Sequence, residues 1–386
     1  MRAYTLGPKD WGASGKQPEI PPKTVTMPVE EGLVTVGVDG HDVDLLLDSG
    51  YYGLDVFDGH WYEETFGRGS CKKRGAACYF CPENAPCNFG KTESVSTLTF
   101  ASGKTVQTIN RSGSLALGGH IVSGITFSVC RVSDVNNYAK PLGHFGISMM
   151  PEISEHFQLP PNMKSLMELL MHRNLVGRLS YTLRTNTTQR STFTSGEITF
   201  GDTIDGAEAA KYIHPEFIRS PKSQRAFPTV WVSSVNLLGA DDHLLRTQGF
   251  PLAHGNSYMT IADTGADGIY LPQPGLINGI IKKLRKGLKQ KGYTNERMHR
   301  MWWRGAGFLH VREEALSSLP VLEFRLATST RLKIRPKHYC TDKGNGTSRL
   351  GIRERKFPTL GTPLFRAYSI HVDYTERTIA LLENQP

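Results

Sequence analysis

The residues best suited to chemistry in this chain are two aspartates that share one local pattern. Asp48 lies within DLLLDSGYYGLDVF and Asp263 within YMTIADTGADGIYLP, so each follows an apolar run and begins an Asp-Ser/Thr-Gly triplet. At the same distance downstream of each triplet comes an apolar residue with glycine, Phe145-Gly146 and Leu360-Gly361. The repetition predicts a duplicated unit with one carboxylate in each half. Two facing carboxylates can share a proton and activate water.

Three longer segments carry a resemblance to a known family. LVTVGVDGHDVDLLLDSG (33–50) is similar to the first hairpin and active-site strand of pepsin-like aspartic proteases (peptidase family A1), and FPTLGTPLFRAYSIHVDYTERTIALLE (357–383) is similar to their closing strands. SGEITFGDTIDGAEAAKYIHP (195–215) resembles the segment that joins their lobes. The resemblance runs from about Met27 to the C-terminus. It implies an all-β fold with a few short helices, in which two related β-barrel-like lobes hold the active-site cleft between them.

The resemblance also predicts how the chain is organised. The expected parts are an N-terminal arm at 1–24, an N-terminal lobe with the first aspartate, a cysteine loop and a flap at 25–205, and a C-terminal lobe with the second aspartate at 206–386. Alternating apolar residues predict strands at 96–100, 105–109 and 125–130. Apolar residues at helical spacing predict a helix within 161–175 and an amphipathic helix at 275–293.

In that family two aspartates act together, and the resemblance gives this role to Asp48 and Asp263. Two neighbouring carboxyls do not both ionise easily, so one keeps its proton. The ionised carboxyl takes a proton from the water that attacks the peptide carbonyl, while the protonated one donates to the carbonyl oxygen. No metal or other cofactor is expected. The residues expected to support the two loops are Ser49, Gly50, Thr264 and Gly265.

Two positions next to the triplets depart from the family pattern. A hydroxyl residue is usual directly after the first triplet, but Tyr51 stands there, and the equivalent position of the second half is Ala266. A hydrogen bond to a carboxylate favours its ionised form. Losing one such bond at each aspartate therefore predicts higher pKa values for the pair and activity at less acidic pH.

The flap departs as well. The best match to the family's flap turn is TINRSGSLALGG (108–119), which puts Asn110 at the usual tyrosine position. The tryptophan that usually supports this tyrosine is replaced by Asp55. Tyr51, Tyr52 and Trp61 are the aromatic residues that could replace this pair in the wall of the substrate cleft. Further candidates for the cleft wall are Tyr270, Leu271 and Phe365. The residues expected at the flap and substrate cleft are thus Asn110, Arg111, Ser112, Gly113, Tyr51 and Tyr270.

Six cysteines are present, and four of them cluster within seventeen residues. The cluster can hold a zinc ion or form two disulfides, and we favour disulfides because the paired spacing of a zinc ribbon is absent. The pairing does not follow from sequence, and the last two cysteines can pair with each other or stay free. The disulfide candidates are Cys71, Cys78, Cys81, Cys87, Cys130 and Cys340.

Charge and sequons bear on partners and compartment. The formal net charge is +9, and the one dense basic stretch lies in the helix expected at 275–293. We interpret it as a surface helix with a solvated lysine face, the alternative being a membrane or polyanion surface. We expect a peptide or protein substrate, no nucleic acid, no integral membrane segment and a monomer. Cysteines and sequons at Asn110, Asn186 and Asn345 favour the secretory pathway, in an extracellular or vacuolar/lysosomal-like compartment, with the leader not visible in this sequence.

Two functions compete for this pattern. The first is an aspartic-type endopeptidase that prefers apolar residues beside the scissile bond. The second is a catalytically impaired homologue that binds peptides or proteins, which the altered flap and the missing hydroxyl partners favour. Both aspartates are retained, and this supports the enzyme. A weaker third idea is a zinc or nucleic-acid module built on the cysteine loop and the basic helix.

Overall fold

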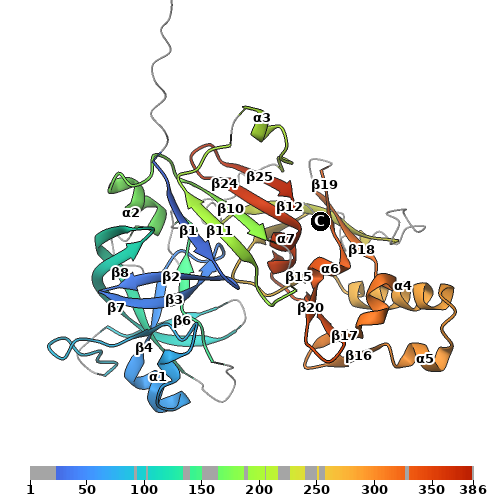
Figure 1. The fold of residues 1–386 in the computed structure, drawn as a ribbon, viewed down its shortest axis with the longest axis horizontal. Coiled ribbons are helices and arrows are strands. Elements are labelled where there is room, and N and C mark those ends of the chain that lie inside the picture. The colour runs from blue at the N-terminus through green and yellow to red at the C-terminus, as the bar shows by residue number, and fades with distance from the viewer. Residues whose placement is uncertain are drawn as a thin grey trace, which may run out of the picture.

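The computed structural model shows two β-rich lobes joined by a central sheet (Figure 1). The structure describes residues 23–90, 94–100, 103–133, 140–149, 164–186, 190–204, 206–215, 227–239, 250–251, 257–326 and 330–384. Most of the arm expected at 1–24, and Asp205 at the expected lobe boundary, lie outside these ranges. The prediction of a mostly β fold with a few short helices is confirmed.

The first lobe is built on an eight-stranded sheet in the order β2-β3-β9-β4-β8-β7-β6, with β5 paired to β4. An additional β2–β7 pairing curls this sheet toward a barrel. The prediction of strands near 96–100, 105–109 and 125–130 is confirmed, although the last two are parts of much longer strands. The bounds are β2 Leu33–Val38, β3 His41–Asp48, β4 Leu54–Asp58, β5 Cys78–Tyr79, β6 Ser96–Thr99, β7 Thr105–Leu117, β8 His120–Val132 and β9 His144–Gly146.

The second lobe contains an eight-stranded sheet in the order β19-β18-β12-β14-β23-β15-β22, with β13 paired to β12, and a four-stranded sheet in the order β16-β17-β21-β20. Their bounds are β12 Thr229–Leu238, β13 Phe250–Pro251, β14 Tyr258–Ala262, β15 Ile269–Leu271, β16 Trp302–Gly305, β17 Phe308–Arg312, β18 Val321–Leu326, β19 Arg331–Ile334, β20 Cys340–Asp342, β21 Thr347–Leu350, β22 Ile352–Glu354 and β23 Thr359–Leu360.

A five-stranded sheet, β1-β11-β10-β24-β25, joins the two ends of the chain. Its strands run from blue through green to red between the lobes in Figure 1. Buried apolar side chains such as Tyr181, Phe200 and Ile370 fill its inner face. Strands from both halves therefore fold as one layer. The bounds are β1 Val25–Val29, β10 Ser180–Asn186, β11 Ser195–Phe200, β24 Tyr368–Asp373 and β25 Thr378–Glu383.

Short helices cover the sheets. The helix expected within 161–175 is α2, which starts with a capping box between Ser165 and Glu168; Met163 lies outside the described residues. The expected amphipathic helix is α4, whose apolar side turns inward through the buried Ile280, Leu284 and Leu288. The bounds are α1 Gly59–Phe66, α2 Leu166–His172, α3 Gly206–Ala209, α4 Leu276–Gln290, α5 Asn295–His299, α6 Pro336–Tyr339, α7 Thr362–Ala367, η1 Ser70–Lys72 and η4 Glu313–Ser318.

Candidate active site

Each aspartate triplet follows a strand, and its downstream glycine pair lies beside it. In the first lobe β3 pairs in parallel with β9, which sets Asp48 opposite Gly146. In the second lobe β14 pairs in parallel with β23, and the Asp263 N–H donates to the Leu360 carbonyl at 3.0 Å. The equal spacing noted in the sequence therefore corresponds to one supersecondary unit built twice.

The two loops are held together by reciprocal hydrogen bonds. The Ser49 N–H donates to Thr264 Oγ1 at 2.9 Å, and the Thr264 N–H donates to Ser49 Oγ at 3.0 Å. Each hydroxyl also donates to a carbonyl in the opposite lobe: Ser49 to Ala262 at 2.7 Å and Thr264 to Leu47 at 2.7 Å. Because both side chains are buried, loss of one would leave polar groups of the other loop without partners.

The glycine of each triplet lets the opposite carboxyl approach. A Cβ atom built on Gly50 would lie 2.6 Å from Asp263 Cγ, and one built on Gly265 would lie 2.5 Å from Asp48 Cγ. Neither separation is sterically possible, so any side chain at these positions would force the loops apart. The Gly50 N–H donates to Asp48 Oδ1 at 2.8 Å and the Gly265 N–H donates to Asp263 Oδ1 at 2.9 Å.

Burial and proximity shift the ionisation of the pair. Burial raises the pKa of Asp48 well above its usual value, and the nearby charge of Asp263 raises it further, against a lowering effect of the Gly50 N–H. Burial also raises the pKa of Asp263, although hydrogen bonds from Asp48 and from the Gly265 N–H lower it in part. The arrangement can hold one proton between two carboxyls.

Beside the first loop lies a buried polar group that the sequence pattern did not predict as a unit. Asp55 is 1% exposed, and its Oδ1 accepts a hydrogen bond from Tyr51 Oη at 3.0 Å. Its Oδ2 lies 3.8 Å from His144 Nδ1 and has no hydrogen-bond partner among the described residues. The residue after the triplet therefore bonds Asp55, four positions along the chain.

Asp55 and His144 are both neutral over a wide pH range. Burial raises the pKa of Asp55 to about 7, although hydrogen bonds from Tyr51 and Ser128 lower it in part. Burial, followed by the charge of Lys104, lowers the pKa of His144 to about 4. Between these values the 3.8 Å contact is not an ion pair. Above pH 7 the charge on Asp55 also raises the pKa of Asp48.

The expected flap turn at Asn110 is wrong. Asn110 and Arg111 lie inside β7, where they pair with Ser128 and Phe127 of β8, and Ser112 and Gly113 continue the same ladder. The register shifts between Gly113 and Ser114, so this glycine belongs to an irregularity within the strand and not to a turn.

The hairpin that reaches Tyr51 is instead formed by β6 and β7. Its connection is closed by two backbone hydrogen bonds of 2.8 Å, from the Phe100 N–H to Lys104 O and from the Gly103 N–H to Phe100 O. The Phe100 ring lies 4.9 Å from the His144 ring and 6.3 Å from the Tyr51 ring. Sequence reasoning missed Phe100 and His144, and the Ser-Gly pair between two segments of alternating residues is the signal that could have found Phe100.

In the second lobe, Tyr270 lies on β15 just after the triplet. Its Oη donates to Asp267, and the Arg355 guanidinium lies 4.9 Å from its ring. Leu271 and Phe365, the other expected wall residues, are 0% and 1% exposed, so both belong to the core and that expectation is wrong. Trp61 packs against Phe57 beside the disulfide-bonded segment.

Four cysteines form disulfides, Cys71–Cys78 and Cys81–Cys87, which confirms the disulfide interpretation of the cluster. Of the two alternatives left open for Cys130 and Cys340, pairing with each other is wrong, because each is a buried free thiol on a separate sheet. Among the described residues no group of three or more His, Cys, Asp or Glu side chains is arranged to hold a metal ion. Within those residues no helix is long and apolar enough to cross a membrane.

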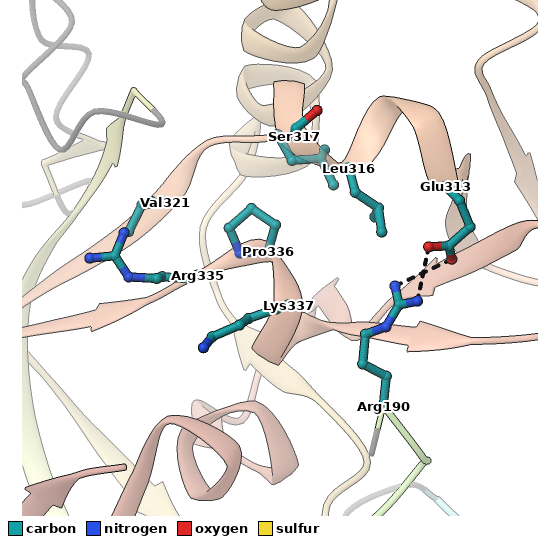
Figure 2. A pocket seen from close by; sticks show the side chains of 9 residues that line it. Arg190, Glu313, Leu316, Ser317, Val321, Arg335, Pro336 and Lys337 are labelled. Atoms are coloured by element: carbon teal, nitrogen blue, oxygen red, sulfur yellow. Dashed lines mark hydrogen bonds and ion pairs between the residues drawn. The ribbon is translucent and has the colours of Figure 1, made fainter. Parts of the chain in front are cut away.

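A separate pocket in the second lobe contains neither aspartate (Figure 2). Pro336 and Lys337 of α6 face Leu316 of η4 across it, and Arg190 pairs with Glu313 at 2.9 Å at one side. Arg190 comes from the connection between β10 and β11, and its carbonyl accepts the Asp342 N–H at 3.0 Å. This pocket is therefore a junction between the central sheet and the second lobe.

A comparison of this chain with models of protein families found one family that matches most of its length. The model for eukaryotic aspartyl protease matches residues 31–383. The chain belongs to this family. As a eukaryotic aspartyl protease it is a hydrolase that acts on peptide bonds, and the predicted pepsin-like relationship is confirmed. None of the curated proteins compared with this protease matches it.

Proposed function

We propose that Asp48 and Asp263 form the catalytic pair of an endopeptidase. The observation that carries this proposal is the reciprocal bonding of Ser49 and Thr264, which holds the carboxyls of Asp48 and Asp263 against each other's glycines. With one proton between them, the ionised carboxyl takes a proton from water and the protonated one donates to the substrate carbonyl oxygen.

We further propose that the substrate has apolar side chains beside the scissile bond. We also propose that the enzyme is active at less acidic pH than is usual for such aspartate pairs. Phe100 and Tyr270 supply half-buried aromatic surface near the two loops, in support of apolar specificity. The raised pKa values of both aspartates support the pH range, because the pair keeps its shared proton to higher pH.

The deciding experiment is cleavage of a denatured protein mixture from pH 3 to 7. We expect cleavage by the wild type and a loss of about 100- to 10,000-fold in both Asp48→Asn and Asp263→Asn, the range typical of general acid–base groups. The exposed Asp42→Asn serves as the matched control. Activity that survives both dyad substitutions would exclude the pair. A wild type that binds a pepstatin-like transition-state mimic without cleaving peptides would favour the alternative, a peptide-binding homologue.

We also propose that the two lobes have the bounds expected from the sequence, 25–205 and 206–386. The protein is proposed to be a monomer and to belong to the secretory or vacuolar system. Two disulfides support the oxidising compartment. The sequon asparagines Asn110, Asn186 and Asn345 are all exposed, which glycan attachment requires. Digestion with an endoglycosidase, followed by mass measurement, tests their occupancy.

A further inference from the structure

A basic pocket lies between α4 and β16, apart from the catalytic loops. Its volume is about 430 Å³, and none of the residues that line it is acidic. The lining residues are Asn278, Ile281, Lys282, Arg285, Trp302 and Arg304. Helix α4, whose sequence is LINGIIKKLRKGLKQ, contributes four of them and contains no acidic residue.

The charges in this pocket have no acidic partner within the part of the chain that the structure describes. Among the described residues Lys282, Arg285 and Arg304 form no ion pair, and Arg304 donates only to Asn278 Oδ1 at 2.8 Å. Trp302 Nε1 is also buried, and no acceptor for its N–H lies among the described residues. The pocket therefore presents several donors and one neutral acceptor, which suits an anionic ligand.

Further arginines extend this positive charge toward the second catalytic loop. Phe308 of β17 lies opposite Gly305 of β16, and the Arg349 and Arg353 guanidinium groups lie 4.2 and 3.4 Å from its ring. Arg355 reaches the ring of Tyr270, close after the second triplet. Of the carboxylates nearby, Asp267 pairs with Arg349 at 3.2 Å and Glu354 accepts the Gly275 N–H at 3.1 Å.

The packing of α4 argues against a lipid bilayer as the ligand. Insertion requires an exposed apolar face on the helix. The apolar residues of α4 are instead buried against the lobe, with Leu276, Ile280, Leu284 and Leu288 each 0% exposed. What remains outside is mostly charge. Arg353 of β22 pairs with Tyr270 of β15, so this arginine lies beside the strand that follows the second aspartate loop. A peptide crossing the catalytic loops would meet this surface next.

We propose that this surface, which we call the basic track and define as Lys282, Arg285, Arg304, Arg353 and Arg355, binds an acidic segment of the protein substrate. The inference rests on the proposed endopeptidase function and names a substrate class for it. Glutamate and aspartate side chains accept paired hydrogen bonds from arginine, and the Trp302 N–H offers one more donor. Binding here holds the substrate while the bond to be cut lies at the aspartate pair.

The kinetic test compares two peptides with one cleavage sequence, of which one carries five extra glutamates at either end. At pH 6 and low salt the glutamates are ionised. We expect Arg285→Glu/Arg304→Glu to raise KM for the acidic peptide about tenfold with kcat unchanged, a size typical of two exposed ion pairs. KM for the neutral peptide stays the same. High salt removes the difference by screening.

The matched control is Lys286→Glu/Lys289→Glu, which makes the same charge change on the exposed side of α4 outside the pocket. An equal rise of KM in the control would overturn the proposal, because net charge alone would then explain the effect. No preference of the wild type for the acidic peptide would overturn it as well.

A binding measurement separates this inference from the proposed function. Fluorescence anisotropy of a labelled glutamate-rich peptide is measured with the Asp48→Asn/Asp263→Asn protein, which needs no catalysis. Binding that is lost in Arg285→Glu/Arg304→Glu on this background supports the basic track even if the chain cleaves nothing. Absence of binding, or binding of anionic vesicles that the peptide does not displace, contradicts it.

Discussion

Asp55 shows how one residue changes the surroundings of the proposed catalytic pair. A buried carboxyl occupies the place expected for a tryptophan, and it is partnered by Tyr51, which itself replaces a small hydroxyl residue. The two residues that depart from the family pattern in the sequence, Tyr51 and Asp55, thus bond to each other in the structure. The Phe100 ring, at the end of the β6–β7 hairpin, lies beside the rings of Tyr51 and His144. Aromatic contacts therefore connect this hairpin to the rest of the first lobe.

Asp55 also makes stability depend on pH in a direction that can be worked out. Its pKa is about 7 in the folded protein against 3.8 as the ordinary value, so the folded state binds this proton more tightly. The stability that it contributes is present at low pH and is lost as pH rises from about 4 to about 7. Asp55→Asn keeps an acceptor for Tyr51 and removes the titration. We expect it to flatten this fall by roughly 1 kcal/mol per pH unit, measured by urea unfolding at pH 4, 5.5 and 7.

Asp42→Asn, an exposed substitution on β3, is the control for Asp55→Asn and leaves the fall unchanged. If Asp55→Asn instead shifts stability equally at every pH, the carboxyl does not titrate in this window. The same variant tests the link to catalysis. The ionised Asp55 carboxylate raises the pKa of Asp48, so we expect Asp55→Asn to lower the alkaline limit of the pH–rate profile.

At the scale of elements, the two aspartate loops depend on each other. Thr264→Val keeps the shape of the side chain but leaves the Ser49 N–H and the Leu47 carbonyl without their partners. We expect a loss of about 2 to 4 kcal/mol in the free energy of unfolding, from two buried groups left unsatisfied. Thermal or urea unfolding measures it. Thr264→Ser retains the hydroxyl and stays within about 1 kcal/mol of the wild type; a large loss there would assign the effect to packing and not to the hydrogen bonds.

The elements also show how far sequence reasoning reached. The aspartate loops and their partner strands were predicted because the information is local, in triplets, apolar frames and downstream glycines. The flap turn was misplaced because Gly113 sits in a strand irregularity, where Asp39 Oδ1 accepts the Ser114 N–H at 2.6 Å. That bond joins residues far apart in the chain, so nothing near Gly113 distinguished an irregular strand from a turn. The Asp55–His144 contact was missed for the same reason.

At the scale of the whole molecule, the central sheet joins strands from both halves of the chain. Strand β10 pairs with β11 from the first half and with β24 from the closing segment. Within it, the Thr182 hydroxyl lies 2.8 Å from His371 Nδ1 in the buried interior. Burial lowers the pKa of His371, so this histidine resists protonation while the chain is folded.

Buried histidines and buried carboxyls thus act on stability in opposite directions. A histidine whose folded pKa is lowered binds its proton more tightly when unfolded, so stability is lost as pH falls from about 6.5 toward the folded pKa. Asp48, Asp263 and Asp55 act in the reverse sense. The buried histidines therefore reduce stability as pH falls, while the carboxyls of the candidate active site favour the folded state there.

His338 gives the sharpest test of this balance. It is 6% exposed, its Nδ1 has no partner among the described residues, and burial followed by the charges of Lys337, Arg366 and Arg335 lowers its pKa to about 4. We expect His338→Gln to reduce the stability lost between pH 7 and pH 4 by on the order of 2 kcal/mol, measured by urea unfolding with the disulfides intact.

The exposed His299→Gln on α5 is the control for His338→Gln and leaves this loss unchanged. A profile for His338→Gln that runs parallel to the wild type would mean that the side chain is already protonated or already solvated in the folded state. The acid limit would then depend on His371 and His144, whose replacement also disturbs the central sheet or the flap contact. His338 separates the two causes because it lies on α6, which is part of neither the central sheet nor the β6–β7 hairpin, so a change in its pH profile reports its own protonation.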